Sequence, residues 1–253
     1  MLKKTLYQLL NILILLIFTD CSPSSERINI PIKKQATNLQ IKKENHKIID
    51  TSALEHLLIQ KNLININSLD SNIRVVLHYS TANNFLNKPL YNGLTNCYLP
   101  CEVALKLCNA QYYLKSQFSN YNIIVFDAVR PLKIQQQMWK ELDIPLKQKI
   151  KYLANPNELS LHNYGAAVDV GIIGNNDLLL DMGTPFDFFG ELSEPKKELI
   201  HIENGSLSEE ALGNRLLLRN VMIKAGFRMI TSEWWHFNSD TKASAATKYQ
   251  LIE

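Results

Sequence analysis

Two short apolar runs, each carrying one aspartate, constrain the fold of this chain more than any other feature. Residues 122–127 end on Asp127, and residues 166–173 contain Asp169 between two valines. Runs of this length and composition are typical of buried β-strands. An unpaired carboxylate is costly to bury, so Asp169 requires a partner that offsets its charge. We therefore expect a sheet whose buried strands carry an ionic site.

The remaining patterns predict a mixture of helices and strands around these two runs. Apolar residues recurring every three to four positions indicate helices, and β-rich segments indicate further strands. Because strand and helix do not alternate strictly, we expect an α+β fold, a single domain with a central, largely antiparallel sheet flanked by helices. The helices are predicted at 100–118, 131–142 and 208–226, and the additional strands at 73–79 and 227–237.

The first 21 residues have the layout of an export signal. Lys3 and Lys4 precede an almost wholly apolar stretch, Leu6–Phe18, which is short for a membrane span. Cys21 follows directly, which is typical of a bacterial lipoprotein whose cysteine is lipidated after cleavage. We expect an exported, periplasmic or cell-envelope protein, anchored to the membrane through Cys21. A plain secreted form and a membrane-anchoring helix are the alternatives.

Composition sets further bounds on domain organisation and partners. Residues 22–50 are rich in Lys, Asn, Gln and Ser and predict a polar tether, which leaves 51–253 as the folded domain. The formal charge of +3 is small for 253 residues, so no nucleic-acid partner is expected. Cys97, Cys101 and Cys108 have no neighbouring histidine and are interpreted as structural, although export would allow two of them to form a disulfide.

Two histidines and one aspartate together predict a metal site. His162 precedes Asp169 by seven residues, and Gly165 between them indicates a turn that folds His162 back over the strand. His236 lies in a third segment. Taken singly, each residue is more simply explained by a surface position, a core position or a salt bridge. Together they offer zinc three ligands and leave a fourth position for water, whose pKa zinc lowers to roughly 7.

Glu233 and Arg130 complete a set of groups that could hydrolyse a peptide bond. Glu233 precedes His236 by three residues, and a base outside the ligand shell can move a proton from water to a leaving amine. In a regular strand these two residues face opposite sides, so a shared role requires a bend. Arg130 could stabilise an oxyanion or form a salt bridge with Asp127, and the two roles are compatible.

The order of five motifs along the chain resembles the D-alanyl-D-alanine metallopeptidases, and in particular the VanX-type D-Ala-D-Ala dipeptidases. The resemblance runs from about residue 70 to 237, which is nearly the whole predicted domain. The motifs are Ser-x-His-x-x-Gly-x-Ala-x-Asp at 160–169, Glu-Trp-Trp-His at 233–236, Asp-Ala-Val-Arg-Pro at 127–131, Met-Gly-Thr-Pro-Phe-Asp at 182–187, and the segment from Tyr79 to Phe85 with Lys88, Pro89 and Tyr91 after it.

The resemblance implies a role for each matching residue. His162, Asp169 and His236 would bind one zinc ion, Glu233 would be the catalytic base, and Arg130 would stabilise the tetrahedral intermediate. The expected activity is zinc-dependent hydrolysis of D-alanyl-D-alanine or a related short D-amino-acid dipeptide.

Three further residues fall where the resemblance implies contact with the substrate. Asp187 and Tyr79 would bind the free ammonium group of the dipeptide, and Ser160 would contact substrate or orient the site. Three alternatives remain. They are a peptidoglycan D,D-carboxypeptidase or endopeptidase with the same zinc site, a non-catalytic zinc-stabilised binding domain, and a serine hydrolase using Ser160 and His162. The last lacks the glycines usual around a serine nucleophile.

Overall fold

The computed structural model describes residues 52–253. The predicted export signal (1–21), its lipidation site Cys21 and the polar tether (22–50) lie outside the described residues. Within residues 52–253, no helix combines the length and the apolar character needed to cross a membrane.

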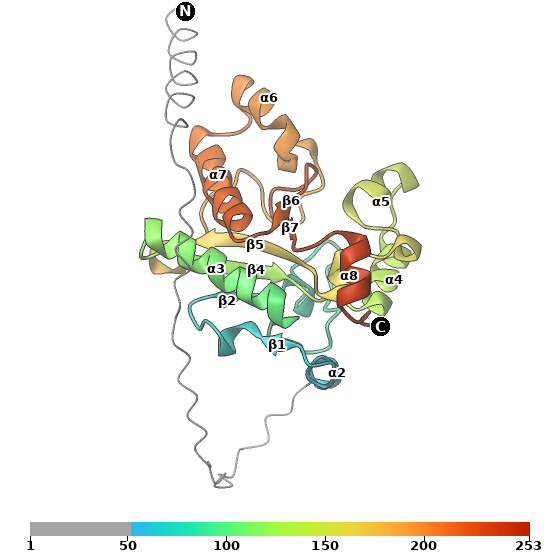
Figure 1. The fold of residues 1–253 in the computed structure, drawn as a ribbon. Helices are drawn as coiled ribbons and strands as arrows, with labels where there is room; N and C mark the ends of the chain where they lie inside the picture. The colour runs from blue at the N-terminus through green and yellow to red at the C-terminus, as the bar shows by residue number, and fades with distance from the viewer. Residues whose placement is uncertain (1–51) are drawn as a thin grey trace, which may run out of the picture. The chain divides into compact units, whose positions relative to one another are not determined.

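A five-stranded sheet with the strand order β2-β4-β5-β7-β6 lies at the centre of this part of the chain (Figure 1). The β2–β4 pair is parallel and the other three pairs are antiparallel. The expected α+β class with a largely antiparallel sheet is therefore confirmed, although the sheet is mixed. The strands are β2 (Arg74–Val75), β4 (Asn122–Asp127), β5 (Ala167–Ile173), β6 (Arg228–Met229) and β7 (His236–Asn238).

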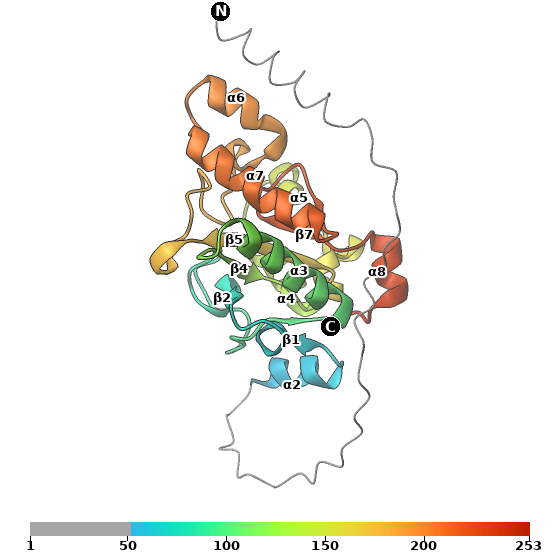
Figure 2. The ribbon, with the colours of Figure 1, turned by 60° about the vertical axis from the view of Figure 1, so that its left-hand side comes forward.

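Two long helices pack on each other and against the sheet (Figures 1 and 2). They are α3 (Cys101–Gln117) and α7 (Glu209–Lys224), and both match the predicted positions. The apolar positions whose helical spacing predicts α3 are buried, namely Val103, Leu107, Ala110 and Leu114. Val168 and Val170 of β5 belong to the same core. Because side chains alternate along a strand, Asp169 points to the sheet face opposite these valines.

Shorter elements surround this core. Helices α4 (Leu132–Glu141), α5 (Leu146–Tyr152) and α8 (Lys242–Lys248) lie at the end of the sheet where β4 ends and β5 begins (Figure 1). The predicted helix at 131–142 is thus confirmed as α4, with Pro131 as its N-cap. The elements that we did not predict include α5, α8, α2 (Ala53–Gln60), α6 (Glu198–Glu203) and the two-stranded sheet of β1 (Ile64–Asn65) and β3 (Tyr98–Leu99).

The predicted strand at 227–237 is wrong in one respect that matters for the site. It is two short strands, β6 and β7, joined by a loop over residues 230–235. Trp234 and Trp235 belong to this loop and their side chains are buried in the core, which explains why the composition of the loop resembled that of a strand. The strand predicted at 73–79 is also shorter, since a 3₁₀ turn begins at His78.

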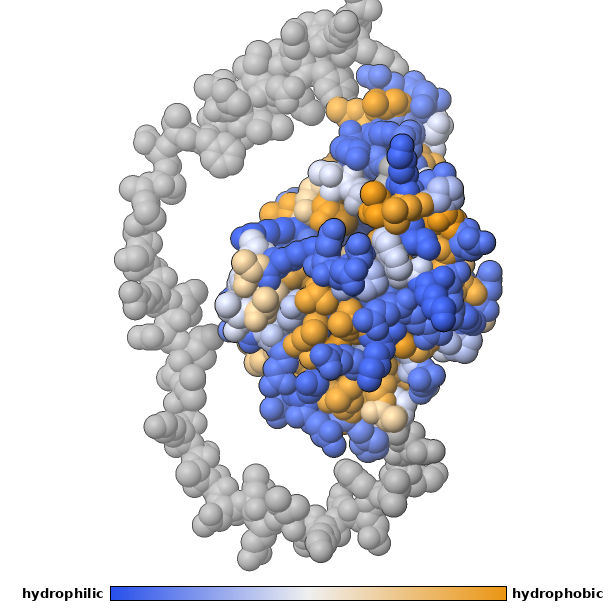
Figure 3. All heavy atoms as spheres, turned by 90° about the vertical axis from the view of Figure 1, so that its right-hand side faces the viewer, coloured by the Kyte–Doolittle hydropathy of each residue, from blue (hydrophilic) through white to orange (hydrophobic). Residues whose placement is uncertain are grey.

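The three cysteines of the described chain have free thiols, and no disulfide joins them. Cys97 is buried and Cys108 is half-buried, as a structural role requires. Cys101 is exposed, so burial does not support a structural role for this residue. On the face of the molecule shown in Figure 3, hydrophobic side chains form separate patches among hydrophilic ones.

Candidate active site

The register of three adjacent strands places two acids and a histidine in one row. Asp127 of β4 is opposite Asp169 of β5, and Asp169 is opposite His236 of β7. An irregularity in β4 between Val125 and Asp127 shifts the register by one residue. Such a bulge re-aims the side chains beyond it, and here it turns Asp127 toward the same face as Asp169.

His162 reaches this row from a tight turn. The 3₁₀ turn η4 (Leu161–Tyr164) ends at Gly165, whose φ of 64° is in the left-handed region that glycine adopts without steric cost. Ser160 caps the turn, since its Oγ accepts a hydrogen bond from the His162 amide at 3.3 Å. The predicted turn that folds His162 back over the Asp169 strand is confirmed.

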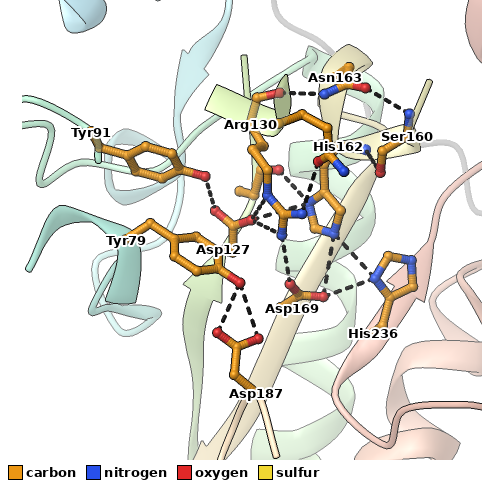
Figure 4. A network of polar contacts seen from close by, with 12 residues as sticks. Tyr79, Tyr91, Asp127, Arg130, Ser160, His162, Asn163, Asp169, Asp187 and His236 are labelled. Carbon is orange, nitrogen blue, oxygen red and sulfur yellow. Dashed lines mark hydrogen bonds and ion pairs between the residues drawn. The ribbon is translucent and has the colours of Figure 1, made fainter. Parts of the chain in front are cut away.

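Three electron-pair donors converge where the turn meets the strands (Figure 4). His162 Nε2 lies 3.2 Å from His236 Nδ1 and 3.4 Å from Asp169 Oδ1. His236 Nδ1 lies 3.0 Å from the same carboxylate oxygen. A tetrahedral ion with bonds of 2.0–2.1 Å would separate its ligand atoms by about 3.3 Å. The triangle therefore has the dimensions of one face of a tetrahedral metal site.

Hydrogen bonds on the far side of each ring determine which nitrogen faces this triangle. His162 Nδ1 donates to the Ala128 carbonyl at 2.6 Å, because a carbonyl can only accept. His236 Nε2 donates to Asn238 Oδ1 at 2.8 Å. When both rings are neutral, each turns an unprotonated nitrogen toward the Asp169 carboxylate. Three electron-pair donors at such distances repel one another unless a cation lies between them, so the residues fit a metal ion.

Asp169 is ionised in this arrangement. Burial alone would raise the pKa of its carboxyl, but in the metal-free chain the positive charge and hydrogen bonds of protonated His162 and His236 rings outweigh burial and hold the pKa well below its usual range. The carboxylate is therefore available as a metal ligand across the physiological pH range.

Arg130 lies beside the triangle and is held in place by an anchored carboxylate. Its Nε and Nη2 donate to Asp127 Oδ2 at 3.0 and 2.7 Å, and its Nη1 donates to Gln135 Oε1 at 3.1 Å. Tyr91 donates to the other Asp127 oxygen at 2.5 Å. Arg130 Nη2 is also 3.7 Å from Asp169 Oδ2. The structure therefore contains the salt bridge between Arg130 and Asp127, and the Arg130 guanidinium also faces the site.

Tyr79 and Asp187 meet on the other side of Asp169 (Figure 4). The Tyr79 hydroxyl donates to both Asp187 carboxylate oxygens, at 2.9 and 3.1 Å. Asp187 has a φ of 60°, a backbone conformation that aspartate tolerates better than most residues. Burial, together with the nearby Asp169 charge, raises the pKa of Asp187 to about 8. Its carboxylate would be stabilised by a cationic group placed beside it.

Glu233 occupies the loop between β6 and β7 rather than a strand, so the bend that a joint role with His236 requires is present. It lines a cavity of about 250 Å³ together with Arg130, Asp187 and the three converging residues. Burial raises the pKa of Glu233 to about 8, and the Asp169 and Asp187 charges add to the rise. A carboxyl group with this pKa can exchange a proton near neutral pH.

The structure thus brings every sequence-predicted site residue of the described chain to one cavity. Ser160 also lines it, next to His162. Sequence reasoning missed the role of Asn238, although a residue two positions after His236 lies on the same strand face. It also missed Thr184, whose Oγ1 accepts a hydrogen bond from Trp234 Nε1 at 2.8 Å. No sequence pattern links those two distant residues.

Comparisons with known proteins agree with this geometry. A family model described as D-ala-D-ala dipeptidase, peptidase M15, matches residues 60–252. The chain is 30% identical over 182 residues to a D-alanyl-D-alanine dipeptidase of Escherichia coli strain K12, which covers 72% of this chain and 86% of that protein. A D-alanyl-D-alanine dipeptidase of Enterococcus faecium is 28% identical over 177 residues, covering 63% of this chain and 82% of that protein.

Proposed function

The chain belongs to the peptidase M15 family of D-Ala-D-Ala dipeptidases, which are metallopeptidases, and from this premise we propose that it hydrolyses D-alanyl-D-alanine or a related short D-amino-acid dipeptide with one bound zinc ion. One observation carries the proposal. Ring nitrogens of His162 and His236 converge with the Asp169 carboxylate beside a cavity that also contains Glu233 and Arg130.

Zinc is the metal that this ligand set suits best, since two imidazoles and a carboxylate are common in catalytic zinc sites. When bound by His162, Asp169 and His236, zinc would polarise the scissile carbonyl and lower the pKa of water to roughly 7. The second hydrogen bond of each histidine ring, to Ala128 and Asn238, orients it for this role.

Glu233 and Arg130 perform the remaining steps of the reaction. Glu233 accepts a proton from the attacking water as the new carbon–oxygen bond forms, and returns it to the leaving nitrogen as the carbon–nitrogen bond breaks. Arg130 faces the negative charge that develops on the carbonyl oxygen, an interaction worth roughly 3–4 kcal/mol in comparable oxyanion sites. Asp127 keeps the guanidinium in position.

Asp187 and Tyr79 restrict the substrate to a dipeptide. Their carboxylate and hydroxyl would accept hydrogen bonds from the free ammonium group, which lies one residue from the bond that is cut. Ser160 orients the site by capping the turn that carries His162. A longer peptide would have an uncharged amide where Asp187 needs a cation, so its hydrolysis would be slow.

Blocking the substrate amine tests this assignment against the carboxypeptidase and endopeptidase alternative. With the zinc-loaded protein, we expect N-acetyl-D-Ala-D-Ala to be hydrolysed at least tenfold less efficiently than D-Ala-D-Ala, because one charge-assisted hydrogen bond is worth about 1.5–3 kcal/mol. Equal hydrolysis of the two compounds would favour a carboxypeptidase. Hydrolysis of neither would favour a non-catalytic binding domain.

We also propose that the protein is exported and anchored to the cell envelope as a lipoprotein, where its substrate would derive from peptidoglycan. The support is the sequence of residues 1–21, with two lysines, an apolar stretch and Cys21. Expression in bacteria with labelled palmitate tests this proposal. The wild-type protein is expected in the membrane fraction with label, and Cys21→Ser is expected to lose the label. A labelled Cys21→Ser protein would exclude this cysteine as the lipidation site.

A further inference from the structure

The cavity lies beside the triad of His162, Asp169 and His236. On its Ser160 side it has a cationic side chain to which the proposed reaction assigns no role. Lys242, the first residue of α8, lines the same cavity as Glu233 and Ser160. Its Nζ donates to the backbone carbonyl of Glu158 at 3.3 Å, two residues before Ser160. Figure 4 shows Ser160 and Asp187 on opposite sides of the converging histidines and Asp169. Lys242 therefore lies toward the end of the cavity away from the proposed ammonium site.

The ammonium group of Lys242 is available for a ligand. Lys248 on the same helix is paired with Asp240 at 3.0 Å, whereas no ion pair among residues 52–253 includes Lys242. Its side chain is exposed, and the carbonyl contact at 3.3 Å is a long one. The other permanent cation of the cavity, Arg130, is buried and held by Asp127.

A dipeptide would bring an anion to this end of the cavity. If its ammonium group binds Asp187 and its peptide carbonyl lies at the triad, its C-terminal carboxylate extends past the triad toward Ser160 and Lys242. The cavity already contains the carboxyl groups of Glu233 and Asp187. A further carboxylate placed among them is repelled and loses hydration unless a cation accepts it.

We propose that Lys242 binds the C-terminal carboxylate of the substrate and makes the enzyme select a free acid at the residue after the cut. This inference rests on the proposed dipeptidase function and adds a second recognition point. Asp187 binds the ammonium group and Lys242 binds the carboxylate, so the two together select a zwitterion of dipeptide length.

The test compares D-Ala-D-Ala with its C-terminal amide, D-alanyl-D-alaninamide, using the zinc-loaded full chain. The wild type is expected to prefer the free acid. Lys242→Met is expected to raise KM for the acid about tenfold, equivalent to about 1.4 kcal/mol, and to leave KM for the amide unchanged. Lys242→Arg keeps the charge and is expected to retain most of the preference. Lys147→Met, which removes an exposed lysine of α5 that does not line the cavity, is the matched control.

Two results would overturn this assignment while leaving the dipeptidase function intact. One is a wild type that hydrolyses the acid and the amide equally well. The other is a Lys242→Met protein whose KM values for the two compounds are unchanged or rise by the same factor. A wild type that hydrolyses neither compound would instead refute the proposed function itself, and with it the inference.

Discussion

Single hydrogen bonds decide what the histidines of this site can do. His162 and His236 use different ring nitrogens toward Asp169, Nε2 in one and Nδ1 in the other, because their protonated nitrogens bond to different partners. Neither partner is identified as such by the sequence. One is the backbone carbonyl of Ala128 in the 127–131 motif, and the other is the amide side chain of Asn238 in the same strand as His236. The ligand types follow from the motifs, whereas the ligand atoms follow from the fold.

Glu233 leads to a prediction about pH. Burial raises its pKa to about 8 in the metal-free chain, and a zinc ion nearby would stabilise the carboxylate and lower that pKa. The base must be deprotonated to act, so activity is lost as pH falls through the pKa. We expect kcat for D-Ala-D-Ala to fall tenfold per pH unit on the acid side, with a midpoint below about 8.

The kcat profile is the relevant measurement because it reports the enzyme–substrate complex, in which Asp187 is already paired with the ammonium group. A kcat that stays level or rises as the solution is acidified from pH 8 to pH 5 would contradict the assignment of Glu233 as the base.

Loops and strand ends, rather than whole strands, bring the reactive groups together. The Asp187 segment and the Glu233 loop are joined by the hydrogen bond from Trp234 Nε1 to Thr184 Oγ1. Arg215, buried in α7, supports the Asp187 segment by donating to the carbonyls of Met182 and Leu192. The proposed amine site at Asp187 and the proposed base Glu233 are therefore held at a set separation.

Removing the Thr184 hydroxyl tests this connection. Thr184→Val keeps the shape of the side chain but leaves the buried Trp234 N–H without a partner, at a cost of about 1–3 kcal/mol. Because small displacements of positioning groups slow catalysis strongly, we expect kcat/KM for D-Ala-D-Ala to fall roughly tenfold or more. Thr184→Ser restores the acceptor and should recover most of the activity. Equal kcat/KM values for the valine variant and the wild type would show that the hydrogen bond does not position the site.

Elements with local sequence signals were predictable and those set by distant contacts were not. The apolar period of α3, the continuous run of β4 and the glycine turn after His162 each depend on neighbouring residues. The loop at 230–235 was not predicted from the sequence, because Trp234 and Trp235 are buried as strand residues would be. The bulge that orients Asp127 depends on strand register, and the contact between Tyr79 and Asp187 depends on long-range packing. Neither feature can be predicted from a single segment of the sequence.

For the folded part of the chain taken together, a metal ion bound by His162, Asp169 and His236 would also be a source of stability. His162 comes from a turn and Asp169 and His236 from two strands, so a bound ion joins segments that are far apart in sequence. Zinc at about 1,000 times its Kd would stabilise the fold by about 4 kcal/mol. For a domain of this size, that corresponds to a rise in Tm of roughly 8–16 °C.

Thermal unfolding with and without zinc measures this effect. Protein stripped by a chelator should unfold at the lower temperature and recover the higher Tm when zinc is added back. His162→Ala, which lacks one ligand, should show no such recovery. Identical Tm values for stripped and zinc-loaded wild type would mean that the triad does not hold the ion.

The most direct test of the proposed reaction is to measure the activity and the metal content of Glu233→Gln side by side with those of the wild type. The variant keeps all three residues proposed to bind the metal, so it should retain one zinc ion per chain while its kcat/KM for D-Ala-D-Ala falls about 10²- to 10⁴-fold. A Glu233→Gln protein that retains its zinc and hydrolyses D-Ala-D-Ala at the wild-type rate would contradict the mechanism.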